Sequence, residues 1–301
     1  MALTYDGFAF LPVAMLFQKY KIIRVFGAHK YRFSLVFNNH IPGPAPGPVL
    51  PMCVDNYFAA PSHCSVRFSV LLTPLICYLR MNDLHFFLDE THFIDSKPEH
   101  YYESSQLGAG IACFTQPGFS IDDADIVLVG CADWTGVDKS MPQGNGPDAV
   151  REQLYKMYYW HTDIRIADLG NIRQGATPAD TRAALQQVLH ELHLAGKIAL
   201  VLGGGHDLML QQYEAFRKSE QMVVASVADM LIDLDETEEV NASGFLLEML
   251  TASPNFISHY SHIGFQSYYA HPQMLETLDK LRFDFYRLGK VREHIEDIEP
   301  V

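Results

Sequence analysis

The stretch VLGGGHDLML, residues 201–210, ends an apolar run with three glycines and then places His206 beside Asp207. Glycine has no side chain, so another group can approach the backbone closely at this point. In α/β proteins, ligands bind in the crevice at the carboxyl ends of the parallel strands. The stretch therefore predicts a strand over residues 198–202 that delivers a histidine and an aspartate to a ligand-binding edge.

Strand and helix patterns alternate on both sides of this stretch. Thr177 is a suitable helix cap, Pro178 suits the first helical position, and Gly196 is a suitable helix end. Alternation of this kind predicts an α/β fold of three layers, α/β/α, with a mainly parallel sheet. The predicted elements are strands DIVLVG (125–130), IALVL (198–202) and MVVASV (222–227), and helices GPDAVREQLYKMYYW (146–160), TPADTRAALQQVLHELHLAGK (177–197) and LMLQQYEAFRKS (208–219).

The charge balance limits the classes of partner. The chain has 22 basic and 36 acidic residues and a net charge of -14. Nucleic acids and anionic membranes require clustered Lys and Arg, so neither is an expected partner. A cationic or small polar ligand fits the composition better.

The cysteine pattern and the apolar runs bear on the compartment. The five cysteines are widely spaced and never form C-x-x-C, which predicts neither a disulfide framework nor a zinc site. The chain has no apolar run of 18 residues, and its N-terminus lacks the basic leader of a secretory signal. These features predict a cytoplasmic protein that does not span a membrane.

The composition changes near Met81. Residues 1–80 contain seven basic and only two acidic residues, and they include the helix- and strand-breaking run IPGPAPGPVLP (41–51). We therefore divide the chain into a poorly specified N-terminal extension, 1–80, and an α/β domain, 81–301. The extension is either an accessory segment or an upstream extension of the reading frame with Met81 as the natural start, and we favour the second.

Carboxylates follow the strand MVVASV just as His206 follows IALVL. If both strands lie in the same parallel sheet, His206 and the acids of ADMLIDLDE (228–236) converge on one crevice. Imidazole beside carboxylates can bind manganese, zinc or iron. The spacing alone also allows a simpler interpretation, in which His206 is a turn residue, Asp207 a helix cap and Asp229 a strand-end residue.

From about Asp125 onward the chain resembles the ureohydrolases, the superfamily of arginase, agmatinase and formimidoylglutamase. The resemblance rests on VLGGGHDL (201–208), with support from GPDAVREQL (146–154), ADLGNIRQG (167–175) and SHIGFQSY (261–268). It implies an arginase-like three-layer fold with two manganese ions at the carboxyl ends of the strands. The resemblance further implies that a hydroxide bridging the ions attacks a guanidinium or amidine carbon. The resemblance also implies a homo-oligomer, because family members commonly form trimers or hexamers.

The resemblance assigns three metal ligands. His206 matches the first metal-binding histidine of the family, and Asp229 and Asp233 match the two aspartates of its D-x-H-x-D motif. Leu231 stands where the motif has its histidine, and a leucine donates no lone pair. A later D-x-D pair is expected beyond Val301, so we interpret the domain as divergent and incomplete at its C-terminus. The set implies one manganese ion or none rather than two.

Other polar residues near the motif do not restore a second metal. Asp235, Glu236, Glu238 and Glu239 are predicted to form a solvated loop. His259 and His262 are placed at a strand entry, at the sheet end opposite the crevice, and are interpreted as structural. Cys131 follows DIVLVG and is interpreted as a small buried hydrophobe.

Two functions follow from the resemblance. The first is metal-dependent hydrolysis of linear C–N bonds in a small amidine or guanidino substrate, such as formimidoylglutamate or an arginine-like compound. The alternative is a catalytically degenerate protein that keeps the fold for binding or assembly. A nucleotide-binding role is disfavoured, because GGGHD lacks the G-x-G-x-x-G spacing and its acidic surroundings repel phosphate. The sequence assigns no catalytic residue.

Overall fold

The computed structural model describes residues 84–137, 144–236 and 242–293. The predicted extension, 1–80, lies outside the described residues, as do Glu238 and Glu239. Within the described part of the chain, no helix is long and apolar enough to cross a membrane.

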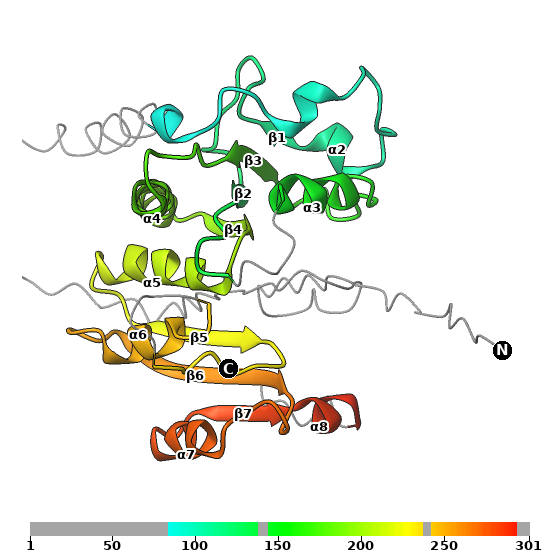
Figure 1. The fold of residues 1–301 in the computed structure, drawn as a ribbon. Helices are drawn as coiled ribbons and strands as arrows, with labels where there is room; N and C mark the ends of the chain where they lie inside the picture. The colour runs from blue at the N-terminus through cyan, green and yellow to red at the C-terminus, as the bar shows by residue number, and fades with distance from the viewer. Residues whose placement is uncertain (1–83, 138–143, 237–241, 294–301) are drawn as a thin grey trace, which may run out of the picture.

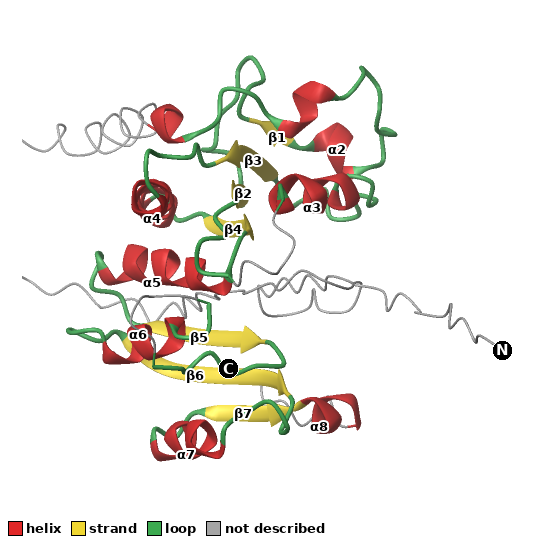
Figure 2. Cartoon of the chain, in the orientation of Figure 1, coloured by secondary structure: helices red, strands yellow, loops and turns green. Residues whose placement is uncertain are grey.

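The described strands form two parallel sheets, as Figures 1 and 2 show. The first has four strands in the order β1-β3-β2-β4, and the second has three in the order β5-β6-β7. The parallel α/β class is thus as the sequence predicts. The strands are β1 (Ala112–Cys113), β2 (Ile126–Cys131), β3 (Ile166–Asn171), β4 (Ile198–Gly203), β5 (Val223–Ala228), β6 (Ile257–Phe265) and β7 (Asp284–Arg287).

Helices cover both faces of the four-stranded sheet. In Figure 1, α3 (Gly146–Leu154) and α4 (Pro178–Leu194) lie on opposite sides of its strands. Every residue of β2 is buried. Val127 and Val129 pack into the same apolar cluster as α4, whereas Ile126 and Leu128 pack against Tyr155 at the end of α3. This division by alternate residues explains why the strand is a continuous apolar run, because both of its faces are covered.

Local signals set the ends of α4. Thr177 caps the helix and forms a capping box with Asp180, and Pro178 is its first residue. Gly196 follows the C-terminus with a φ of +69°. These are the cap, the first helical residue and the end that the sequence predicts. Such signals can be read from sequence because each acts within about one turn of the helix.

The helix α3 is shorter than predicted. The sequence suggests a helix to Trp160, but α3 ends at Leu154. The backbone beyond it pairs with the loop before α2 (Leu107–Gly110), since Met157 O accepts from Leu107 N and Tyr159 N donates to Ser105 O. These tertiary hydrogen bonds replace helical ones, so the apolar spacing of residues 157–160 does not extend the helix.

Within the described residues, the strands β4 and β5 lie in different sheets, so the shared sheet that was the condition for a common crevice is not formed. Each is an edge strand of its own sheet within the described residues. After β4, the chain passes through the short helix η3 (His206–Leu208) into α5 (Met209–Arg217). The apolar face of α5 packs into the core of the second sheet, through Met209, Leu210, Tyr213 and Phe216. This packing brings the carboxyl ends of β4 and β5 together although the two strands are not paired.

Short elements complete the described chain. They are η1 (Leu84–Phe87) and η2 (Phe93–Ser96) before the first sheet, and α6 (Phe245–Thr251), α7 (Pro272–Lys280) and α8 (Leu288–Glu293) around the second.

Candidate metal centre

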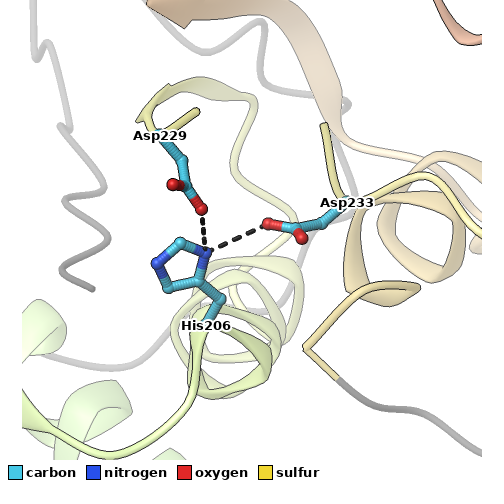
Figure 3. Close-up of side chains that lie close together, drawn as sticks. All are labelled: His206, Asp229 and Asp233. Atoms are coloured by element: carbon cyan, nitrogen blue, oxygen red, sulfur yellow. Dashed lines mark hydrogen bonds and ion pairs between the residues drawn. The ribbon is translucent and has the colours of Figure 1, made fainter. Parts of the chain in front are cut away.

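Three side chains converge where β4 and β5 end. His206 Nδ1 lies 3.0 Å from Asp233 Oδ2 and 3.3 Å from Asp229 Oδ2. Figure 3 shows both carboxylates directed at this one ring nitrogen. One ligand atom from each residue lies within 4.8 Å of the others, and the side chains of His206 and Asp233 are each only 2% exposed. The structure therefore brings together the three residues that the resemblance assigns to a metal.

The chain holds each of the three at the end of an element. His206 opens η3, and its ring packs edge-on against Phe245, the first residue of α6. Asp229 follows the last residue of β5. Ile232 and Leu234, both buried, anchor the backbone on either side of Asp233. Because these neighbours are apolar and buried, the Asp233 carboxylate has little freedom to turn towards solvent.

The glycines before His206 make room for the neighbouring loop. A Cβ on Gly203 would lie 2.2 Å from Cys131 O, and one on Gly204 would lie 1.8 Å from Asp133 O. The glycine segment and the end of β2 are also hydrogen-bonded through their backbones, since Gly204 N donates to Cys131 O. These glycines therefore permit the close approach that the sequence predicts, and the group that approaches is the loop after β2.

Replacing Gly204 by alanine is expected to lower the free energy of unfolding by about 1–3 kcal/mol, as overpacking does in other cores. The clash is with a backbone oxygen, which cannot move aside as a flexible side chain can. Urea unfolding would measure the effect. The control is Gly289→Ala in α8, where an added Cβ meets nothing within 4 Å. Equal stability of the two variants would contradict the packing argument.

Asp207 belongs to a neighbouring ion cluster. Arg182 on α4 donates to Asp207 Oδ2 at 2.5 Å and to Asp133 Oδ2 at 2.6 Å. Burial raises the pKa of Asp207, with Arg182 opposing the shift. For Asp133, burial is outweighed by hydrogen bonds from Thr135 and Arg182, which hold its pKa below the usual value. Arg182 thus ties together the loops after β2 and β4.

A groove lined by both polar and apolar residues borders this cluster. It has a volume of about 580 Å³ and lies between the loop after β2 and the start of α4. Pockets that bind small molecules typically have ~300–1,000 Å³. The lining includes Asp133, Trp134, Thr135, Gln174, Thr177 and Thr181.

The two histidines of β6 lie on different sides of the strand. His259 is partly exposed and pairs with Asp284 at 2.9 Å. His262 is fully buried and its Nε2 lies 3.1 Å from the backbone oxygen of Asp229. The sequence placed both at the sheet end opposite the crevice, which is wrong for His262. Strand residues alternate between faces, so Tyr260 and His262 share a face that His259 does not.

Tyr260 is the nearby residue that the sequence reasoning missed. Its hydroxyl lies 2.8 Å from His262 Nδ1. Burial, with the charges of Asp233 and Asp229, raises the pKa of Tyr260 well above its ordinary value. Burial also lowers the pKa of His262 to about 4. Both groups are therefore neutral at physiological pH. The i, i+2 spacing of Tyr260 and His262 in a strand is the signal that indicates their proximity.

The remaining predictions for single residues are confirmed where the structure describes them. Cys131 is fully buried, and burial raises the pKa of its thiol to about 12. A thiol of this kind is unreactive at neutral pH. Asp235 and Glu236 are exposed, as expected of a solvated loop.

The donor set of the centre fits a divalent cation. One imidazole nitrogen and two carboxylate oxygens surround the same point, and they supply two negative charges. Mixed nitrogen and oxygen ligands of this kind suit manganese, iron or zinc. The other ring nitrogen, His206 Nε2, is buried without a hydrogen-bond partner among the described residues. Since no described residue hydrogen-bonds Nε2, the ring hydrogen can reside there, and Nδ1 can present its lone pair to a cation.

A parallel α/β fold with a His–Asp–Asp cluster at the strand ends is typical of a metal-binding protein. A model of the arginase family matches residues 124–298, which is more than half of the chain. The chain belongs to the arginase family.

Among curated relatives, the chain is similar to two formimidoylglutamases. It is 28% identical to that of Hahella chejuensis (strain KCTC 2396) over 148 residues, which cover 46% of this chain and 45% of the relative. It is 36% identical to that of Klebsiella pneumoniae (strain 342) over 87 residues, which cover 28% and 27% respectively. The chain thus matches less than half the length of each relative.

Solved structures share the fold. A Trypanosoma cruzi formiminoglutamase with Mn²⁺ aligns with a TM-score of 0.55 at 18% identity, covering 63% of this chain and 67% of that one. Formimidoylglutamase from Bacillus subtilis subsp. subtilis str. 168 aligns with a TM-score of 0.54 at 16% identity, covering 71% and 68%. At these identities the likeness establishes the arginase-like fold alone.

Proposed function

We propose that the protein is a formimidoylglutamase-like member of the arginase family that binds one Mn²⁺ and hydrolyses a linear amidine. The observation that carries the proposal is the convergence of His206, Asp229 and Asp233 within 4.8 Å. Both relatives described above are formimidoylglutamases, which supports formimidoylglutamate as the first substrate to test.

The three residues would hold the cation, and the groove beside Asp133 is large enough for a small polar substrate. A bound divalent cation supplies a water of lowered pKa as nucleophile and polarises the group it contacts. Hydrolysis adds water across the C–N bond of the amidine, which releases an amine and an amide. For formimidoylglutamate the amine product is glutamate.

A second function, binding without turnover, is favoured by one specific observation. Leu231 lies between Asp229 and Asp233 and has no donor atom. Within the described residues, the candidate cluster contains three ligands, enough for one ion with water completing its shell. In the family chemistry two ions share bridging ligands, so a single ion favours slow hydrolysis or none.

The experiment is metal loading followed by a substrate test on the full chain. After Mn²⁺ loading and dialysis, elemental mass spectrometry is expected to find about one ion per chain, since three protein ligands suffice for one. Release of glutamate from formimidoylglutamate is then measured with and without chelator, with arginine and agmatine as comparison substrates.

Each outcome has a clear meaning. Chelator-sensitive glutamate release supports the enzyme, and bound Mn²⁺ without release supports the binding protein. Two ions per chain would show that further residues complete a dimetal centre. Absence of bound Mn²⁺ would overturn the proposed function.

A further inference from the structure

We propose that Tyr260 and His262 on β6 act as a hydrogen-bonded pair that positions Asp229 for the cation. The inference rests on the proposed metal centre and assigns a role to two residues outside the three ligands. Both side chains lie in the fully buried interior of the second sheet, against the end of β5.

The geometry fixes the direction of each hydrogen bond. His262 Nε2 lies 3.1 Å from the backbone oxygen of Asp229, and a carbonyl oxygen can only accept. The imidazole therefore carries its hydrogen on Nε2. His262 Nδ1 is then the acceptor for the hydroxyl of Tyr260, 2.8 Å away. Tyr260 selects the tautomer in which His262 donates to Asp229.

The same strand holds the other backbone group of Asp229. Asp229 lies just beyond the ladder between β5 and β6, which ends at Ala228 paired with Ile263. Its N–H donates to Ile263 O at 3.1 Å. The backbone N–H and C=O of Asp229 are thus both bonded to β6, one by the backbone and one by the imidazole of His262.

Fixing this backbone fixes the carboxylate. Asp229 Oδ1 accepts from Met230 N at 2.6 Å, and Oδ2 lies 3.3 Å from His206 Nδ1. Without the His262 hydrogen bond, the carbonyl of the peptide between Asp229 and Met230 loses its partner on β6, and the peptide can tilt. That tilt would turn Oδ2 away from the point that the three ligands share. Outer-shell partners that orient a ligand typically contribute about 10- to 100-fold in metal affinity.

The test is the Mn²⁺ dissociation constant of the full chain, measured by isothermal titration calorimetry. His262→Leu is expected to bind Mn²⁺ about 10- to 100-fold more weakly than the unsubstituted chain. His262→Gln, whose side-chain amide can still donate, is expected to recover most of the lost affinity. Tyr260→Phe keeps nearly the same shape but loses the hydroxyl. Its Mn²⁺ affinity is expected to lie between those of His262→Leu and His262→Gln. The matched control is His259→Leu on the same strand, which is expected to leave the affinity unchanged because His259 pairs with Asp284.

Thermal unfolding without metal separates positioning from folding. A purely structural role would lower the melting temperature of His262→Leu and leave the affinity of the folded protein unchanged, which would overturn the inference. If His262→Leu does not fold, the Mn²⁺ affinity of Tyr260→Phe is the deciding measurement. An affinity of Tyr260→Phe equal to that of the unsubstituted chain overturns the inference. Failure of the unsubstituted chain to bind Mn²⁺ would overturn the proposed function and the inference together, so the two failures are distinguishable.

Discussion

Replacing His206 by alanine is expected to abolish the Mn²⁺ binding that we propose for this centre. His206 Nδ1 lies close to both carboxylates, at 3.0 Å from Asp233 and 3.3 Å from Asp229. Without it, two buried carboxylates must hold a cation without the nitrogen ligand between them. The loss of affinity should exceed the roughly 10- to 100-fold that removal of an outer-shell partner causes.

Metal content after Mn²⁺ loading and dialysis measures this effect. The matched control is Asp235→Asn, which removes an exposed carboxylate two residues after Asp233 and should leave the metal content unchanged. Retention of the ion by His206→Ala would show that the cation binds elsewhere. Loss of the ion in both variants would show that acidic residues bind the cation non-specifically and that the chain has no defined centre.

Replacing Arg151 by leucine is expected to destabilise the fold by about 3–5 kcal/mol, the range seen when one partner of a buried ion pair is removed. Arg151 on α3 donates to Asp168 on β3 through Nε at 2.8 Å and Nη2 at 2.9 Å, and both side chains are fully buried. The loss is a large share of the ~5–15 kcal/mol that stabilises a typical domain. Urea unfolding at pH 7 measures it.

The destabilisation caused by Arg151→Leu should depend on pH in a defined direction. Burial would raise the pKa of Asp168, but His92 Nε2, 3.2 Å away, and the charge and hydrogen bonds of Arg151 outweigh it and hold the pKa well below its usual value. The stability that Asp168 contributes is therefore present above about pH 4, the unfolded value, and is lost as pH falls towards the folded pKa. In Arg151→Leu the carboxyl loses its cation and its pKa rises. The deficit of the variant is therefore expected to be largest at neutral pH and to shrink below about pH 4.

A surface pair provides the control. Arg165 pairs with Asp123 at 3.2 Å, and both side chains are exposed. Exposed ion pairs contribute at most about 1 kcal/mol, so Arg165→Leu should be nearly neutral at every pH tested. An Arg151→Leu variant that is as stable as Arg165→Leu would contradict the assigned role of the buried pair.

Local sequence signals predicted several parts of the structure correctly. The cap at Thr177, the first turn at Pro178 and the end at Gly196 are as expected, because neighbouring residues alone decide them. The buried strand β2 follows from its apolar run for a similar reason. Where tertiary hydrogen bonds compete with local pattern, prediction fails, as it does beyond Leu154 in α3.

By itself, the sequence determined the parallel α/β class, because strand periods and helix caps are local. Its resemblance to the ureohydrolases, at GGGHD and D-x-L-x-D, assigned the three metal-ligand candidates. Only the tertiary structure decided that β4 and β5 lie in separate sheets, that the glycines accommodate a neighbouring loop, and that His262 reaches Asp229. These features depend on contacts between residues some 30 to 70 positions apart. Such contacts form when buried apolar surfaces pack, as α5 does on the second sheet, and no short pattern specifies that packing.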